Sequence, residues 1–134
     1  MRTAITLLQC EFEYYYAISK QSDYSTWFFE GEITIAIDGQ RHTEKVLFER
    51  GMAEWNIEKD KPYFSNVFSC DKYKKLPNNL IVFFYIQYTD NGYIFEIHTG
   101  TGLDTMQLQE PTYKLLPYEA NNKLYYRYRY QRYF

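Results

Sequence analysis

Apolar, β-branched and aromatic residues dominate the stretch 80–99, which the dipeptide Asn91-Gly92 divides in two. Asn-Gly supplies the two positive-φ positions of a type I′ turn, so the pattern predicts a β-hairpin with these two residues as its loop, in which Tyr88 faces Phe95. One face of this hairpin then carries the core residues Phe84, Ile86, Tyr88, Tyr93, Phe95 and Ile97. The other face is also partly apolar, which is typical of a central strand whose second face is at least partly covered.

A second hairpin is predicted over 27–50, with Asp38-Gly39 as its two-residue loop. This register sets Glu32 opposite Lys45, a favourable pair on a solvent-facing side. Two other pairings are imperfect, namely Ile33 with Glu44 and Ile35 with His42. They indicate either that the hairpin tip projects past the core or that a bulge shifts the register.

Two long stretches near the ends of the sequence, 3–20 and 124–134, alternate with a period of two and are predicted to be strands. The core face of the first carries Leu8, Cys10, Phe12, Tyr14, Tyr16 and Ile18. The last strand has one aromatic face and one face that bears arginines. Shorter strand pieces are predicted at 106–109 and at 113–116, the second of which is closed by Pro117.

The segment 51–79 is the least regular part of the chain, and Ser65 in it is predicted to cap a short helix that runs to about Leu76. Aromatic residues make up 21% of the sequence, with 16 Tyr and 10 Phe, and this composition favours strands. The predicted fold class is mainly β, or α+β with one short helix. We expect a single domain over 1–134, an antiparallel, strongly curved sheet or flattened barrel of about six to eight strands.

The charges are segregated along the chain, because all 17 Asp and Glu precede residue 120 and the last strand is basic. An acidic body disfavours nucleic acid as the main partner and favours a basic protein surface. Neither a secretory signal nor a membrane-spanning pattern is recognised, so a cytoplasmic location is expected. Cys10 and Cys70 are interpreted as reduced thiols, with Cys10 buried.

Signatures of catalysis and of metal or cofactor binding are weak throughout the sequence. His42 and His98 have no second ligand at metal spacing, and we predict neither a metal nor a cofactor. A small enzyme that uses His98 with Glu96, two residues away on the same strand face, is an alternative. No residue is assigned a catalytic role in the leading hypothesis.

The aromatic excess favours a protein-binding surface, because exposed Tyr, Trp and Arg are typical of interface hot spots. The leading hypothesis is a non-catalytic binding domain, most concretely a bacterial toxin-immunity protein that neutralises a basic, nuclease-like toxin. The residues predicted to bind this partner are Glu11, Glu13, Asp23, Trp27, Glu54, Trp55, Glu58, Asp60 and Tyr63. A homodimer through the terminal strand is also considered, since terminal strands are templates for pairing.

A third possibility is a barrel that binds an apolar small molecule. Aromatic residues of the central hairpin and of the last strand would line its cavity. These residues are Phe83, Tyr85, Tyr88, Phe95 and Tyr128.

Overall fold

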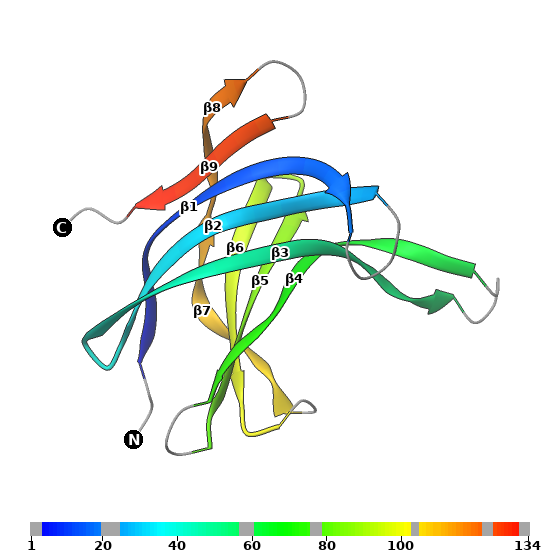
Figure 1. The fold of residues 1–134 in the computed structure, drawn as a ribbon. Helices are drawn as coiled ribbons and strands as arrows, with labels where there is room; N and C mark the ends of the chain where they lie inside the picture. Colours follow the sequence, from blue (N-terminus) through cyan, green and yellow to red (C-terminus); the bar gives the residue numbers. More distant parts are fainter. Residues whose placement is uncertain are drawn as a thin grey trace.

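The computed structural model describes residues 4–19, 25–56, 61–75, 79–102, 105–121 and 125–131, and within these ranges the chain forms nine strands and no α-helix. The strands are β1 (Ile5–Ile18), β2 (Ser25–Ile37), β3 (Gln40–Asn56), β4 (Lys61–Lys75), β5 (Ile81–Thr89), β6 (Gly92–Gly100), β7 (Gln107–Lys114), β8 (Leu116–Asn121) and β9 (Tyr125–Gln131) (Figure 1). They form one sheet in the order β7-β6-β5-β4-β3-β2-β1-β9-β8, and each pair of neighbouring strands in this order is antiparallel. The prediction of a mainly antiparallel β fold is confirmed.

The hairpin of β2 and β3 has the register that the sequence predicts, with Ile37 opposite Gln40 and Glu32 opposite Lys45. Asp38 and Gly39 have positive φ values of 47° and 85°, as a type I′ turn requires. The pairing from Phe28 to Ile37 continues without a bulge, so a shifted register does not explain the imperfect pairs. Nor does the tip as a whole project past the core, because Ile33, Ile35 and Ile37 of β2 are buried in the core up to the turn. The residues opposite Ile35 and Ile33 on β3, His42 and Glu44, are half-buried.

The central hairpin, β5 and β6, has a different turn from the predicted one. Its loop is Asp90-Asn91, and Tyr88 faces Tyr93 where the sequence predicts Phe95. Gly92 has a positive φ of 103°, and Asn91 does not have one, so a type I′ turn over Asn91-Gly92 cannot form. The register moves by two residues, which leaves every side chain on its predicted face.

A bulge in β1 changes which of its residues face the core. The pairing with β2 shifts between Leu7 and Gln9, and the buried positions change from odd numbers (Ile5, Leu7) to even ones (Cys10, Phe12, Tyr14). Leu8, predicted on the core face, is therefore only half-buried. One extra residue inverts the alternation of side chains, which a strict period of two does not anticipate.

The predicted helix from Ser65 is wrong, because Ser65 lies within strand β4. The ladder partners that β3 and β5 offer on either side satisfy the backbone of this segment and override its local helix signals. After Glu49 in β3 and before Val67 in β4, these two strands pair only with each other in the part of the chain that the structure describes. They form a two-stranded projection, here called the β3–β4 ribbon (51–56 and 61–66), that extends away from the other strands (Figure 1).

The two edges of the sheet are consecutive in the chain, because Leu115 alone separates β7 from β8. Each edge strand contains a proline, Pro111 in β7 and Pro117 in β8, and a proline cannot donate a hydrogen bond to an incoming strand. Pro117 lies within β8, so the prediction that it ends a strand is wrong. Strand β9 lies between β1 and β8, so it is not the free edge from which a homodimer was expected.

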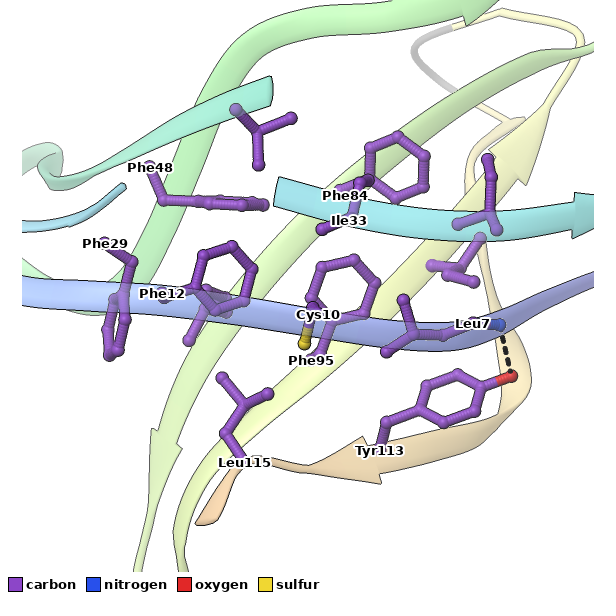
Figure 2. Packing of buried hydrophobic residues seen from close by; sticks show 14 of the residues in the cluster. Leu7, Cys10, Phe12, Phe29, Ile33, Phe48, Phe84, Phe95, Tyr113 and Leu115 are labelled. Carbon is purple, nitrogen blue, oxygen red and sulfur yellow. Dashed lines mark hydrogen bonds between the residues drawn. The ribbon is translucent and has the colours of Figure 1, made fainter. Parts of the chain in front are cut away.

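The core lies between the inner faces of two parts of the sheet, with β1 packed against β6 although four strands separate them in the strand order. The rings of Phe12 and Phe95 stack with centroids 6.5 Å apart, and Phe48 contacts both of them edge-on (Figure 2). Where β1 and β7 approach each other, the Leu7 N–H donates to the Tyr113 hydroxyl at 3.2 Å (Figure 2). The two parts are thus joined by aromatic packing and by a side-chain hydrogen bond.

Gly31 of β2 permits a close approach between β1 and β2. A Cβ atom at this position would collide with the carbonyl oxygen of Glu11 and crowd the Cα of Phe12, both of which are backbone atoms of the neighbouring strand. We expect Gly31→Ala to lower the free energy of unfolding by about 3 kcal/mol, because the backbone must shift to accept the methyl group.

Urea denaturation measures this change, and its sign is diagnostic. At a site without a clash, replacement of glycine by alanine stabilises a protein by about 0.4–1 kcal/mol, because alanine lowers the conformational entropy of the unfolded chain. A stabilised Gly31→Ala variant would contradict the packing of β1 against β2.

Candidate partner-binding surface

Four glutamates form a compact group on the outer face of β1 and β2. Cross-strand pairing sets Glu11 opposite Glu32 and Glu13 opposite Glu30. Glu11, Glu30 and Glu32 are exposed, and Glu13 is half-buried. We call these four residues the acidic block.

Cations border the acidic block unevenly. Arg129 of β9 lies opposite Glu11, and Lys45 of β3 lies opposite Glu32, so this row has one cation at each end. In the next row Arg127 of β9 pairs with Glu13, but the β3 neighbour of Glu30 is Leu47, which is apolar. Like charges directly opposite each other destabilise a sheet, and Glu30 has no cation as its β3 cross-strand partner to offset that cost.

Tyr15 supports the second row of the block from the same strand face. Its hydroxyl donates to Glu30 Oε2 at 2.7 Å, and its ring stacks on Phe28 at 5.4 Å. Burial, followed by this hydrogen bond, raises the pKa of Tyr15 above its ordinary value. The hydroxyl therefore stays protonated and continues to donate to the carboxylate at neutral pH.

A hollow lies beside the first row of the block, over β9, β1 and β2. It is lined by Gln9, Cys10, Glu11, Glu32, Thr34, Arg129 and Tyr130. The side chains around it include two carboxylates, a guanidinium and an amide, which suit the polar side chains of a partner. Cys10 also borders the hollow, but its side chain belongs to the core on the other face of the sheet. It is a free, buried thiol, and burial raises its pKa to about 12, so it is a poor nucleophile.

An aromatic cluster continues the inner face of the sheet past the core. Tyr14 stacks on Trp27 at 4.5 Å, and its hydroxyl shares a 2.8 Å hydrogen bond with the hydroxyl of Tyr93. Tyr16 packs against Trp27 at 5.3 Å and is 50% exposed. This cluster lies on the opposite face of the sheet from the acidic block.

The residues predicted to bind a partner fall into three places. Glu11 and Glu13 belong to the acidic block, whereas Trp27 lies in the inner-face cluster. Three predicted residues lie on strands of the β3–β4 ribbon, namely Glu54, Trp55 and Tyr63. Asp23, Glu58 and Asp60 lie outside the described residues. The structure thus does not gather the predicted set on one surface.

Sequence reasoning missed Glu30 and Glu32, which complete the acidic block. The signal for them was available, since both alternate with apolar residues along the strand that precedes the Asp38-Gly39 turn. Pairing that strand with 3–20 would have placed them beside Glu11 and Glu13.

The residues of the alternative enzyme hypothesis do contact each other. His98 Nε2 lies 3.2 Å from Glu96 Oε1, and the His98 ring meets that of Tyr85 edge-on at 4.7 Å. His98 pairs with Phe83 across the strands, not with Tyr85, which the predicted register with Tyr88 opposite Phe95 would place there. Among the described residues, no three His, Cys, Asp or Glu side chains are grouped so that they could hold a metal ion.

The residues of the predicted apolar cavity do not share a face. Phe95 is fully buried among other rings on the inner face, and Tyr88 and Tyr128 contact Tyr93 there. Phe83 and Tyr85 alternate with the buried Val82, Phe84 and Ile86, so they lie on the outer face. These five side chains therefore cannot line one cavity.

Comparison with known proteins gives no relative for this chain, since no family model, no curated protein and no solved structure matches it. None of the residues that the structure describes forms a helix with the length and apolar character needed to cross a membrane.

Glu30→Gln tests the electrostatic cost of the acidic block. Glutamine keeps an acceptor for Tyr15 and removes the repulsion with Glu13, so we expect a gain of about 0.5 kcal/mol in the free energy of unfolding at low salt. The gain should shrink in 1 M salt, where charges are screened. Asp90→Asn, at an exposed turn, is the control, and an equal gain there would show that only net charge matters.

The raised pKa of Tyr14 predicts that the protein loses stability at alkaline pH. Burial and then the hydrogen bond with Tyr93 raise the pKa of Tyr14, whereas an unfolded tyrosine ionises near a pH of about 10. The contribution of the Tyr14 hydroxyl to the free energy of unfolding is complete below that pH. It is lost as pH rises above it, because the unfolded state releases a proton that the folded state retains.

Denaturation of wild type and Tyr14→Phe between neutral pH and pH values of about 11 measures this effect. The variant should lose less stability over that interval than wild type. Tyr16→Phe, which removes a hydroxyl from an exposed side chain of the same strand, is the matched control. Parallel pH profiles for wild type and Tyr14→Phe would contradict the assignment.

Proposed function

We propose that this chain is a small, non-catalytic protein-binding domain that recognises a basic protein through the acidic block. The observation that carries the proposal is the pairing of like charges, Glu11 with Glu32 and Glu13 with Glu30, on exposed neighbouring strands. Such pairs cost stability in the isolated protein, and costs of this kind are commonly retained where function requires them. A partner with positive charge would remove the repulsion on binding.

Long-range electrostatics give this arrangement a kinetic advantage. A concentrated patch of one sign attracts an oppositely charged protein and raises the rate of encounter. Tyr15, which is half-buried on the same face, and Leu47, which is exposed opposite Glu30, would then supply desolvated anchors that set affinity. The β3–β4 ribbon, which bears Glu54, Trp55 and Tyr63 in its sequence, is a second element that a partner can reach.

The concrete form of the proposal is a bacterial, cytoplasmic immunity protein that covers the basic active site of a nuclease-like toxin. An inhibitor of this kind needs a rigid scaffold and complementary charge but no catalytic group. The acidic block on a sheet of paired strands meets that requirement. No cofactor is part of the proposal.

Affinity capture from a lysate of the native organism, followed by mass spectrometry, tests the proposal. We expect the tagged chain to retain a basic protein in stoichiometric amount, and the double variant Glu11→Gln/Glu30→Gln to lose it. The matched control Asp90→Asn/Glu110→Gln removes two exposed acids outside the block and should still capture the partner. Capture that survives loss of the block, or the absence of any basic protein, would contradict the proposal.

With the captured partner in hand, association kinetics provide a sharper measurement. At low salt Glu11→Gln/Glu30→Gln should slow association by about tenfold relative to wild type, because steering depends on local charge. The two rates should converge as salt screens the charges. Equal association rates at low salt would exclude the acidic block as the steering surface.

A further inference from the structure

Strand β7 is joined to the rest of the sheet along one side only. It lies at one end of the strand order, and β6 is its one ladder partner among the described strands. That ladder is interrupted, because residues 110–112 of β7 lie opposite Glu96 alone. The middle residue of the three is Pro111, which has no N–H to donate. Two short runs of paired residues, 107–109 and 113–114, therefore hold β7 to β6.

The side chains of β7 add little to this attachment. Tyr113 is buried, Gln109 is half-buried, and the other residues of the strand are exposed. Strand β5, on the other side of β6, by contrast buries Val82, Phe84 and Ile86 in the core. A segment with few buried apolar contacts and solvent-exposed backbone hydrogen bonds opens at a low cost in free energy.

Tyr113 lies where β7 meets two strands that it does not pair with. Its hydroxyl accepts a hydrogen bond from the Leu7 N–H of β1 at 3.2 Å (Figure 2). Its ring contacts that of Tyr130 in β9 edge-on at 5.1 Å and that of Phe95 in β6 at 6.5 Å. This one side chain thus links β7 to β1 and β9.

The part of β1 that Tyr113 reaches has a free edge. Strand β9 pairs with β1 from Gln9 to Tyr14, so residues 5–8 have β2 as their one ladder partner among the described strands. Leu7 in this part belongs to the core, as does Ile97 of β6. Strand β7, which pairs with β6 and bonds to Leu7, therefore closes the gap between β6 and the first part of β1.

The chain is anchored at both ends of β7. After the strand, Leu115 is 2% exposed, and its N–H donates to the carbonyl oxygen of Tyr93 at 2.9 Å. Before the strand, Thr105 Oγ1 accepts from the N–H groups of Thr101 and Gly102 at 3.1 and 2.9 Å. A segment that is fixed at both ends can leave the sheet without displacing the elements that precede and follow it.

We propose that residues 107–113 form a strap that opens by local unfolding while the other strands stay folded, with Tyr113 as its latch. The open strap uncovers the core at Leu7 and Ile97, which are 0% and 1% exposed in the closed form. It also frees the edge of β6 that β7 covers. The strap thus controls access to the interior of the sheet. This proposal does not rest on the proposed function, which uses the outer face of β1 and β2.

Native-state hydrogen exchange of the wild-type chain at low urea concentrations tests the proposal. We expect the strap amides that pair with β6 to exchange at least about tenfold faster than the paired amides of β2 and β5. Their exchange should depend little on urea, because opening of the strap exposes little surface. Strap amides with the same protection and the same urea dependence as those of β5 would overturn the proposal.

Val46→Ala separates the opening of the strap from global unfolding. Val46 is buried in β3, which does not neighbour β7 in the sheet. Its truncation should speed the exchange of β5 amides by at least about tenfold, because it destabilises the folded sheet. The strap amides should keep their wild-type rates, since the sheet stays folded when the strap opens. Equal acceleration in β5 and in the strap would overturn the proposal.

Tyr113→Phe tests the latch, because it keeps the ring and removes the hydroxyl that the Leu7 N–H reaches. Exchange of the strap amides and of the Leu7 amide should rise about fivefold, the factor that corresponds to one hydrogen bond of about 1 kcal/mol. Tyr130→Phe removes a hydroxyl from the ring that Tyr113 contacts and is the matched control, in which both rates should stay at the wild-type values. Unchanged exchange of the strap in Tyr113→Phe would overturn the assignment of the latch.

Discussion

The contact between Phe12 of β1 and Phe95 of β6 is the interaction on which the rest of the structure depends. These strands are separated by β5, β4, β3 and β2 in the sheet, so their rings meet only because the two parts of the sheet face each other. Phe29, Phe48 and Phe84 extend the packing through mostly edge-on and tilted contacts. Aromatic pairs of this kind add specific geometry to the burial of apolar area.

This packing also explains why aromatic residues are so abundant. A sheet that encloses its own core without helices must fill the space between facing strands with long side chains. Phenylalanine fills the centre, where six phenylalanines are fully buried among the residues whose burial the structure describes, and tyrosine occupies the margins, where hydroxyls reach partners. The Tyr14 and Tyr93 hydroxyls bond each other, and the Tyr113 hydroxyl accepts from a backbone N–H of β1.

The two hairpins show how far local sequence determines this fold. The Asp38-Gly39 turn was predicted in its correct register, because both of its residues adopt positive φ. In the β5–β6 hairpin, the Asn91-Gly92 pair predicts the correct strand faces but a register displaced by two residues. The alternation of side chains does not distinguish the predicted register from the observed one. Side-chain bonds of Thr89 to Asn91 and Gly92, which accompany the actual turn, are not apparent from composition.

Long-range pairing accounts for what sequence patterns did not predict. The bulge at Leu8 and the strand at Ser65 both depend on neighbouring strands that are distant in sequence. The candidate surface follows the same rule. Glu11 and Glu13 are predicted from the sequence to bind a partner, but the acidic block exists only because β1 pairs with β2 in a register that brings Glu30 and Glu32 alongside.

The position of β9 between β1 and β8 has a consequence for how the chain reaches this structure. Gln9 of β1 pairs with Gln131 of β9, so β1 lacks its second neighbour until synthesis has passed through all the strands between them and reached β9. Contacts of such sequence separation slow folding, and an unpaired strand remains open to association with other chains during that time. The ribosome and its chaperones would therefore meet β1 as an exposed, aromatic edge until β9 has been synthesised.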